Sequence, residues 1–164
     1  MQVNSEFTDV PVLHPHSHRF ASMADAKLFA TAGNATITLE SIKTGVHYTY
    51  KVRESKAVEN STKAPVHFVS LLTGPDNEND FKYLGLIVPN RYLLTITKAS
   101  KLSTGSAPVL AFNYFWSRPD GAIPSQLAVY HSGRCGRCNR TLTTPESITR
   151  GIGPDCSELM GLDL

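Results

Sequence analysis

Alternating apolar and polar residues dominate the first half of the chain. In residues 46–53, tyrosine and valine alternate with polar side chains, which is the two-residue period of a strand with one buried face. Residues 35–42 are similarly rich in β-branched side chains, and Lys43-Thr44-Gly45 between the two segments indicates a hairpin turn. Further apolar runs between turn residues bring the expected strands to about five; these runs are 66–72, 83–88 and 92–97.

Two segments of this region have the spacing of helices. Ser22 is a typical N-cap residue, and the short helix after it should end at Gly33. A second helix should begin at Ser106, where proline follows two residues later, and continue to Arg118. Strands followed by a helix favour an α+β fold, with an antiparallel sheet packed against the helix.

The pattern divides the chain of 164 residues into three parts. Residues 1–20 contain several prolines and histidines without periodicity, which predicts a flexible N-terminal arm. Residues 21–125 form the predicted α+β domain, and residues 126–164 hold all three cysteines. No apolar run approaches the roughly 20 residues that span a bilayer, and no secretory signal is evident. We therefore expect a cytoplasmic protein without a membrane partner, in which cysteines bind metal more often than they form disulfides.

The three cysteines have the spacing of a metal site. Cys135 and Cys138 are separated by two residues, and 17 residues separate Cys138 from Cys156. A C-x2-C pair forms a tight knuckle that lets both sulfurs face one ion. Cys156 falls in the first turn of a short helix predicted to start at Gly153-Pro154, after a helix that ends at Gly151. This is the plan of a treble-clef-like module with a structural Zn2+ at the C-terminus.

A structural zinc usually takes a fourth protein ligand. His131 ends the apolar stretch 127–130, a predicted strand, and is the candidate for that position. A disulfide or free thiols remain the alternative for the cysteines. If His131 does not bind, an open coordination position would suit a catalytic zinc with Glu146 as the nearest acid, although no H-x-E deaminase signature precedes the cysteines.

Charge and aromatic residues suggest two binding surfaces. There are 16 basic and 14 acidic residues, a net charge of +2, so binding to nucleic acid would need a local patch. Four arginines crowd the cysteines and would either contact phosphate or balance the charge of the metal site: Arg134, Arg137, Arg140 and Arg150. Tyr50, Tyr83 and Tyr92, with Lys51 and Arg53 nearby, would stack on bases or line the core, depending on strand register. Phe68 is assigned to the core.

The C-terminal motif also carries a family resemblance. Residues 131–148, His-Ser-Gly-Arg-Cys-Gly-Arg-Cys-Asn-Arg-Thr-Leu-Thr-Thr-Pro-Glu-Ser-Ile, and the following Gly-Ile-Gly-Pro-Asp-Cys resemble a domain-of-unknown-function family frequent in phage and prophage proteins. The resemblance implies a small zinc-binding module, sometimes attached to helicase-like proteins, and extends upstream to residue 24. Asn139 departs from the glycine expected there, but asparagine tolerates a left-handed backbone.

These observations give three hypotheses for function. The first is a small phage-type zinc-binding accessory protein of an infected or prophage-carrying bacterial host, non-enzymatic, which binds nucleic acid. The second is a protein-binding inhibitor or adaptor directed at host machinery, for example an anti-defence protein. The third is a zinc-dependent hydrolase or deaminase. No phosphate loop, nucleophile elbow or carboxylate pair is found, so neither an enzyme nor a small-molecule substrate is expected.

Overall fold

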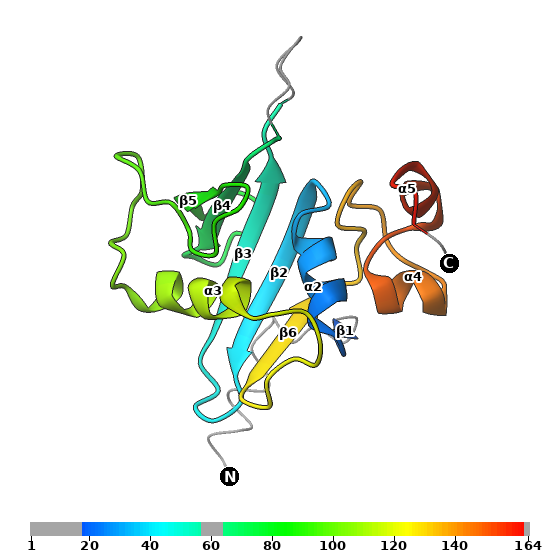
Figure 1. The fold of residues 1–164 in the computed structure, drawn as a ribbon, viewed down its shortest axis with the longest axis horizontal. Helices are drawn as coiled ribbons and strands as arrows, with labels where there is room; N and C mark the ends of the chain where they lie inside the picture. The colour runs from blue at the N-terminus through cyan, green and yellow to red at the C-terminus, as the bar shows by residue number, and fades with distance from the viewer. Residues whose placement is uncertain (1–17, 57–63, 163–164) are drawn as a thin grey trace.

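A single antiparallel sheet organises the protein (Figure 1). The computed structural model describes residues 18–56 and 64–162; most of the predicted arm, with His14 and His16, lies outside them. Six strands pair in the order β1-β6-β2-β3-β4-β5. Their bounds are β1 His18–Arg19, β2 Asn34–Ser41, β3 His47–Glu54, β4 His67–Leu72, β5 Phe81–Ile87 and β6 Leu127–His131.

Two helices cover one face of this sheet, and two shorter ones follow β6. Helices α2 (Met23–Ala30) and α3 (Ala107–Ser117) lie across the face seen in Figure 1. Helices α4 (Pro145–Arg150) and α5 (Pro154–Leu159) lie together beyond α2, close to the C-terminus. Within the described residues, no helix is long and apolar enough to cross a membrane.

Most of the predicted elements are present. Four of the expected strands appear as β2 to β5, and helices begin after Ser22 and Ser106 as predicted. The fifth expected strand, at 92–97, is wrong, because this segment makes only an isolated bridge between Leu86 and Thr95. The strand predicted at 127–130 is confirmed as β6, and with β1 it brings the sheet to six strands.

Strand β6 joins the region of the cysteines to the rest of the protein. It lies between β1 and β2, with Ile37 opposite His131 and Leu39 opposite Val129. The predicted boundary at 126 therefore falls directly before a strand of the main sheet. Residues 18–20, assigned to the flexible arm, also need correction, because β1 pairs with β6 and Phe20 is buried.

The core fills the space between the sheet and its two covering helices. Tyr50 of β3 is fully buried there, with its ring 5.1 Å from that of Phe112 and its hydroxyl donating to the Pro108 carbonyl at 2.8 Å. Burial raises the pKa of Tyr50, with a smaller contribution from Tyr48. The expectation that Tyr50 stacks on bases is therefore wrong: this side chain belongs to the core.

Candidate metal centre

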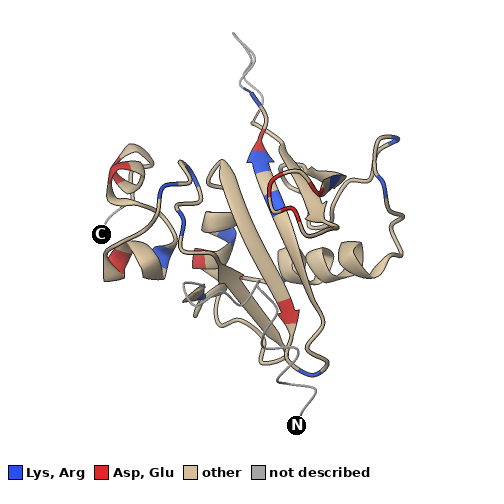
Figure 2. Ribbon diagram, turned by 180° about the vertical axis from the view of Figure 1, so that it is seen from behind, with Lys and Arg blue, Asp and Glu red and all other residues tan. Residues whose placement is uncertain are grey.

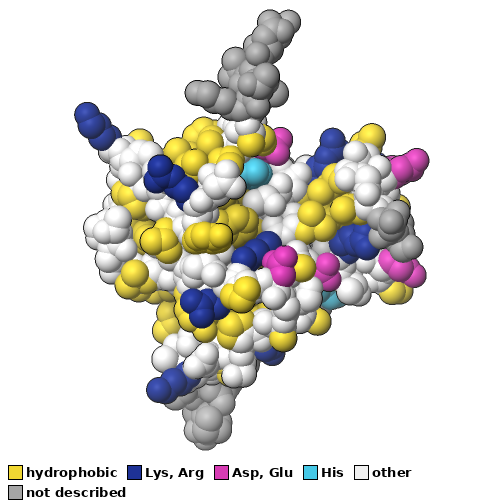
Figure 3. Space-filling view, viewed as in Figure 1, with side chains coloured by type: hydrophobic (Ala, Val, Ile, Leu, Met, Phe, Trp, Pro, Cys, Tyr) yellow, Lys and Arg dark blue, Asp and Glu magenta, His cyan; other side chains and the backbone are white. Residues whose placement is uncertain are grey.

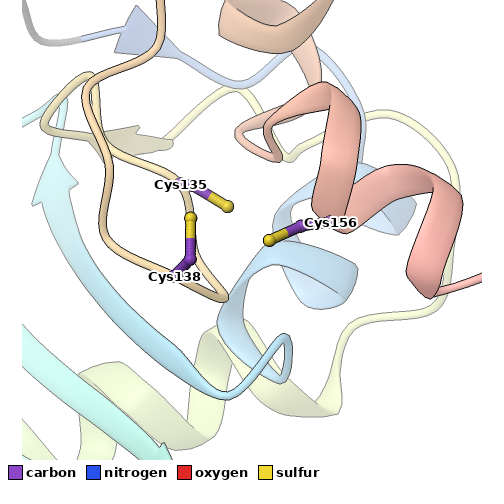
Figure 4. A group of neighbouring side chains, drawn as sticks. All are labelled: Cys135, Cys138 and Cys156. Carbon is purple, nitrogen blue, oxygen red and sulfur yellow. The ribbon is translucent and has the colours of Figure 1, made fainter.

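The three cysteines, two from one loop and the third from a helix, converge at one point (Figure 4). Their sulfur atoms all lie within 4.8 Å of one another, and none forms a disulfide. Cys135 and Cys138 come from the loop after β6, and Cys156 comes from α5. Four-coordinate zinc with Zn–S bonds of about 2.3 Å requires sulfurs about 3.8 Å apart. The cluster has the size of a metal site, with Cys135 and Cys156 buried and Cys138 exposed.

Backbone hydrogen bonds shape the loop into the predicted knuckle. The Cys135 N–H donates to the Arg140 carbonyl at 2.8 Å, and the Asn139 N–H donates to the Cys135 carbonyl at 2.9 Å. Arg134 and Thr141 form an antiparallel bridge just outside this turn. Asn139 has a φ of 66°, in the left-handed region, so asparagine fills the position at which glycine was expected. The turn holds Cys135 and Cys138 on the same side.

N–H donors surround the buried sulfurs. The Gly153 N–H donates to Cys135 Sγ at 3.3 Å and the Arg137 N–H at 3.4 Å. Burial alone would raise the pKa of Cys135, but donors from Gly153, Cys138 and Arg137 together lower it. Burial raises the pKa of Cys156, which the Arg137 guanidinium at 3.6 Å partly offsets. Donors of this kind stabilise the thiolate, the form in which cysteine binds metal.

The knuckle is packed tightly against the main domain. The Gly136 N–H donates to the Gly151 carbonyl at 2.9 Å, and the Gly136 carbonyl accepts from the Asn34 N–H, at the start of β2, at 2.7 Å. A Cβ at Gly136 would lie 2.7 Å from Phe29 Cδ1 and 2.8 Å from the Phe29 carbonyl oxygen. Only glycine lets the knuckle approach the end of α2 this closely.

His131 does not join the cysteines, and its prediction as the fourth ligand needs correction. Its Nδ1 accepts the Gly133 N–H at 3.0 Å, so the ring proton is on Nε2, which donates to the Ile148 carbonyl at 2.7 Å. Both nitrogens are thus occupied, and the ring packs between Phe20 and Phe29. The pKa of His131 is lowered to about 4, chiefly by burial; the Ile148 carbonyl opposes the shift, and His18 adds a smaller lowering. His131 ties β6 to α4 as a neutral side chain.

Across residues 18–56 and 64–162, no other histidine, cysteine or carboxylate completes the group. Glu146, the predicted nearest acid, is exposed on α4. It lines a separate hollow with residues of α2 and α4, and no cysteine borders that hollow. The geometry therefore does not place Glu146 beside the sulfurs, where a catalytic base would have to lie.

The four predicted arginines fall into two pairs. Arg137 and Arg150 contact side chains of α5: Arg137, although exposed, donates to Cys156 Sγ at 3.6 Å, and half-buried Arg150 donates to Ser157 Oγ at 3.1 Å. This pair fits the charge-balancing and structural interpretation.

Arg134 and Arg140 are exposed on the knuckle. Arg134 donates to the Asn139 carbonyl at 3.2 Å, and Arg140 lies 4.0 Å from Asp155 with both side chains largely in solvent. An exposed pair at this distance contributes little energy. Both guanidinium groups therefore remain accessible.

The predicted tyrosines lie on different surfaces. Tyr83 is half-buried on the face of the sheet opposite α2 and α3, with its ring 6.3 Å from Phe68. Tyr92 is 74% exposed, but it follows β5 in a loop next to α3, since Trp116 Nε1 donates to the Arg91 carbonyl at 3.3 Å. Phe68, assigned to the core, is instead 43% exposed beside Tyr83. Phe68 and Val69 are neighbours in one apolar run, so the sequence alone does not show which of them faces solvent.

The chain thus contains a cysteine cluster able to hold a metal ion, set against an antiparallel sheet. Residues 125–161 match the family model described as "Family of unknown function (DUF6011)". The matched segment covers β6, the knuckle, α4 and α5, so it includes the metal centre and its link to the sheet. Comparison with curated proteins and with solved structures found no match.

Proposed function

We propose that the chain is a small, non-enzymatic protein that binds nucleic acid and uses a structural Zn2+ to hold its binding surface in shape. The observation that carries this proposal is the knuckle itself. Its three converging sulfurs fix the backbone between Arg134 and Arg140, and both of these guanidinium groups are exposed. Guanidinium groups held on a rigid turn suit bidentate contacts with phosphate.

The donor set supports Zn2+ as the metal. Thiolates are soft ligands, and structural zinc sites commonly contain three or four of them. A zinc ion with three thiolates has one net negative charge, and the Arg137 guanidinium lies 3.6 Å from one of these sulfurs. This contact would balance the charge and orient Cys156. With no acid beside the sulfurs in the described residues, we assign the ion a structural role and favour neither a hydrolase nor a deaminase.

Fluorescence anisotropy with labelled single-stranded and duplex oligonucleotides tests the proposal. We expect binding that weakens as salt rises, because each phosphate contact releases counterions. The double variant Arg134→Gln/Arg140→Gln should bind more weakly with a shallower salt dependence, at unchanged zinc content. Lys43→Gln, which removes an exposed cation from the β2–β3 turn, is the matched control. Absence of binding, or binding independent of salt, would contradict the proposal.

One observation favours a second function, that of a protein-binding adaptor or inhibitor. Apolar side chains gather on the surface over α3 (Figure 3). Tyr92, Leu93 and Leu110 are 74%, 56% and 54% exposed, and the loop lies against α3 because the Leu94 N–H donates to Asn113 Oδ1 at 2.7 Å. A contiguous apolar patch of this kind is typical of protein contacts.

A pull-down from nuclease-treated host lysate separates the two functions. Under the adaptor hypothesis, one stoichiometric protein should be retained by the wild type and lost with Leu110→Asp. Under the nucleic-acid hypothesis, the immobilised protein should retain no partner after nuclease treatment. The Leu110→Asp variant should bind oligonucleotides as the wild type does.

A further inference from the structure

The face of the sheet opposite the helices contains a hollow that the metal centre does not use. Figure 2 shows this face, with basic residues near the end of β3 and the acidic loop between β4 and β5 beside them. The hollow has a volume of about 210 Å³. Its lining residues come from three strands and that loop: Lys51, Arg53, Phe68, Ser70, Glu78 and Phe81.

Strand register brings these side chains together. Arg53 pairs with Phe68, and Lys51 pairs with Ser70, across β3 and β4. Directly paired residues point to the same face of a sheet. On β5, Phe81 lies close enough for the Lys51 ammonium to sit 4.5 Å from its ring centroid. Two basic side chains of β3 therefore lie beside an aromatic ring of β4 and one of β5.

The Phe68 ring contacts Tyr83 along one edge and is partly exposed to solvent. The two rings meet in an edge contact at 6.3 Å, and the Tyr83 hydroxyl accepts a hydrogen bond from Thr97 Oγ1 at 3.3 Å. The remaining 43% exposed fraction of Phe68 faces solvent. A planar apolar ring held from one edge and open on another is suited to stacking on a base.

The cations of the hollow are poorly compensated. Burial lowers the pKa of Lys51, neighbouring Arg53 lowers it further, and Glu78 opposes them. In the part of the chain that the structure describes, neither Lys51 nor Arg53 lies within 4.0 Å of a carboxylate oxygen. A bound anion would supply the missing negative charge, while Glu78 at the rim would weaken its binding.

We propose that this hollow binds one nucleotide of a single-stranded nucleic acid, with the base stacked on Phe68 and the phosphate between Lys51 and Arg53. The inference rests on the proposed nucleic-acid-binding function and adds strand selectivity to it. A base must be unpaired and splayed out to stack on a side chain of the sheet. A duplex offers its phosphates but not the faces of its bases.

The test is the affinity of fluorescein-labelled dT12 for the full chain and its variants. Phe68→Ala should weaken binding by about tenfold, since stacking on one base is worth ~1–3 kcal/mol and 1.4 kcal/mol is tenfold. Phe68→Tyr keeps the ring and should bind within about twofold of the wild type. Lys51→Gln should reduce the salt slope by about one phosphate contact, and Glu78→Gln should strengthen binding.

Tyr114→Ala is the matched control, because it removes a partly exposed aromatic ring of α3, outside the hollow. Thermal unfolding of every variant shows whether the sheet remains intact. Ultraviolet cross-linking of the wild type to dT12 should label the peptide with Phe68 or Phe81, and this readout does not depend on any substitution.

The outcomes distinguish this inference from the proposed function. If neither dT12 nor the duplex binds, the proposed nucleic-acid-binding function and the inference about the hollow are both wrong. If dT12 binds but Phe68→Ala and Lys51→Gln behave as Tyr114→Ala does, only the hollow is excluded, and the knuckle arginines remain the interface. Duplex binding as tight as dT12 binding, or thymidine monophosphate binding as tight as dT12, would overturn the single-strand assignment.

Discussion

The metal centre and the sheet hollow are built in opposite ways. Cys135, Cys138 and Cys156 come from adjacent segments of one short region, and two of them are buried against the main domain. The hollow draws its side chains from β3, β4 and β5, and its central ring, Phe68, is largely open to solvent. The cysteine cluster is packed into the fold, whereas the hollow is a surface that the completed sheet presents.

This difference predicts how each site responds to substitution. Changes in the metal centre should affect stability and binding together, because the knuckle, Phe29 and His131 share one packed region. Changes in the hollow should affect binding alone, because exposed side chains contribute little to stability.

Cys135→Ser should release the metal and destabilise the protein by several kcal/mol. Binding of structural zinc supplies ~10–16 kcal/mol in small zinc-finger peptides, and Cys135 also accepts two backbone N–H groups. Elemental analysis and thermal unfolding measure the two effects. Cys156→Ser and Cys138→Ser should behave alike, whereas Lys51→Gln should keep its metal and unfold within about 0.5 kcal/mol of wild type. A Cys135→Ser protein with full zinc content and an unchanged melting curve would contradict the structural role.

His131→Ala separates metal binding from packing. Since both ring nitrogens of His131 are engaged within the protein, this variant should be destabilised yet retain its metal under conditions in which it is folded. Loss of the metal from the folded variant would show that His131 is a metal ligand.

Gly136→Ala tests the contact between the knuckle and α2. The added methyl would lie 2.7 Å from Phe29 Cδ1 and 2.8 Å from a backbone oxygen. Overpacking of this kind typically costs ~1–3 kcal/mol, so the melting temperature should fall and the metal should be released more readily to a chelator. Gly105→Ala is the control, because a Cβ there would meet nothing within 4 Å. Equal stability of the two variants would show that the knuckle does not pack against α2 of the main domain.

The same contrast explains what the sequence could and could not predict. The metal knuckle follows from the spacing of Cys135, Cys138 and Cys156, with a left-handed Asn139 between them. These are short-range features, so they can be recognised without the fold. Strands β2 and β3 also follow from local alternation, β4, β5 and β6 from short apolar runs, and α2 and α3 from their helix-start residues and spacing.

Long-range pairing accounts for the predictions that were wrong. His131 lies four residues before Cys135, but β6 pairs with β2, and Ile37 opposite His131 faces the covered side of the sheet. That register turns the imidazole into the core, away from the sulfurs. Phe68 was misassigned for the same reason, since its partner Arg53 lies on the open face. A period of two gives the alternation along a strand but does not identify which face is covered.

The stability of the metal-centre region should also depend on acidity through His131. Its pKa is about 4 in the folded protein against 6.5 for an exposed histidine, so between these values the unfolded chain binds a proton that the folded protein does not. The free energy of unfolding should therefore fall as the pH drops from 6.5 towards 4, by at most ~1.4 kcal/mol per pH unit from this group.

His131→Gln should show a shallower loss of stability across this window, whatever its stability at neutral pH. Urea unfolding between pH 7 and pH 5 measures the slope, with bound metal recorded at each pH because the thiolates also take up protons. The control is His47→Gln, which removes a histidine from the start of β3. Parallel slopes for wild type and His131→Gln would show that His131 is not held neutral by burial.

The smallest expected effects come from the helix caps, and they test whether the two regions unfold together. The Ser22 hydroxyl accepts the Asp25 N–H at the start of α2, and the Thr144 hydroxyl accepts the Ser147 N–H at the start of α4. Removing either cap by Ser22→Ala or Thr144→Ala should cost ~1 kcal/mol. Ser106→Ala is the control, because Ser106 makes no such bond to α3. Since the helices meet through Phe29 and the knuckle, both variants should shift one common unfolding transition. A Thr144→Ala protein with two transitions, the first accompanied by metal release, would instead make the metal centre an independent folding unit.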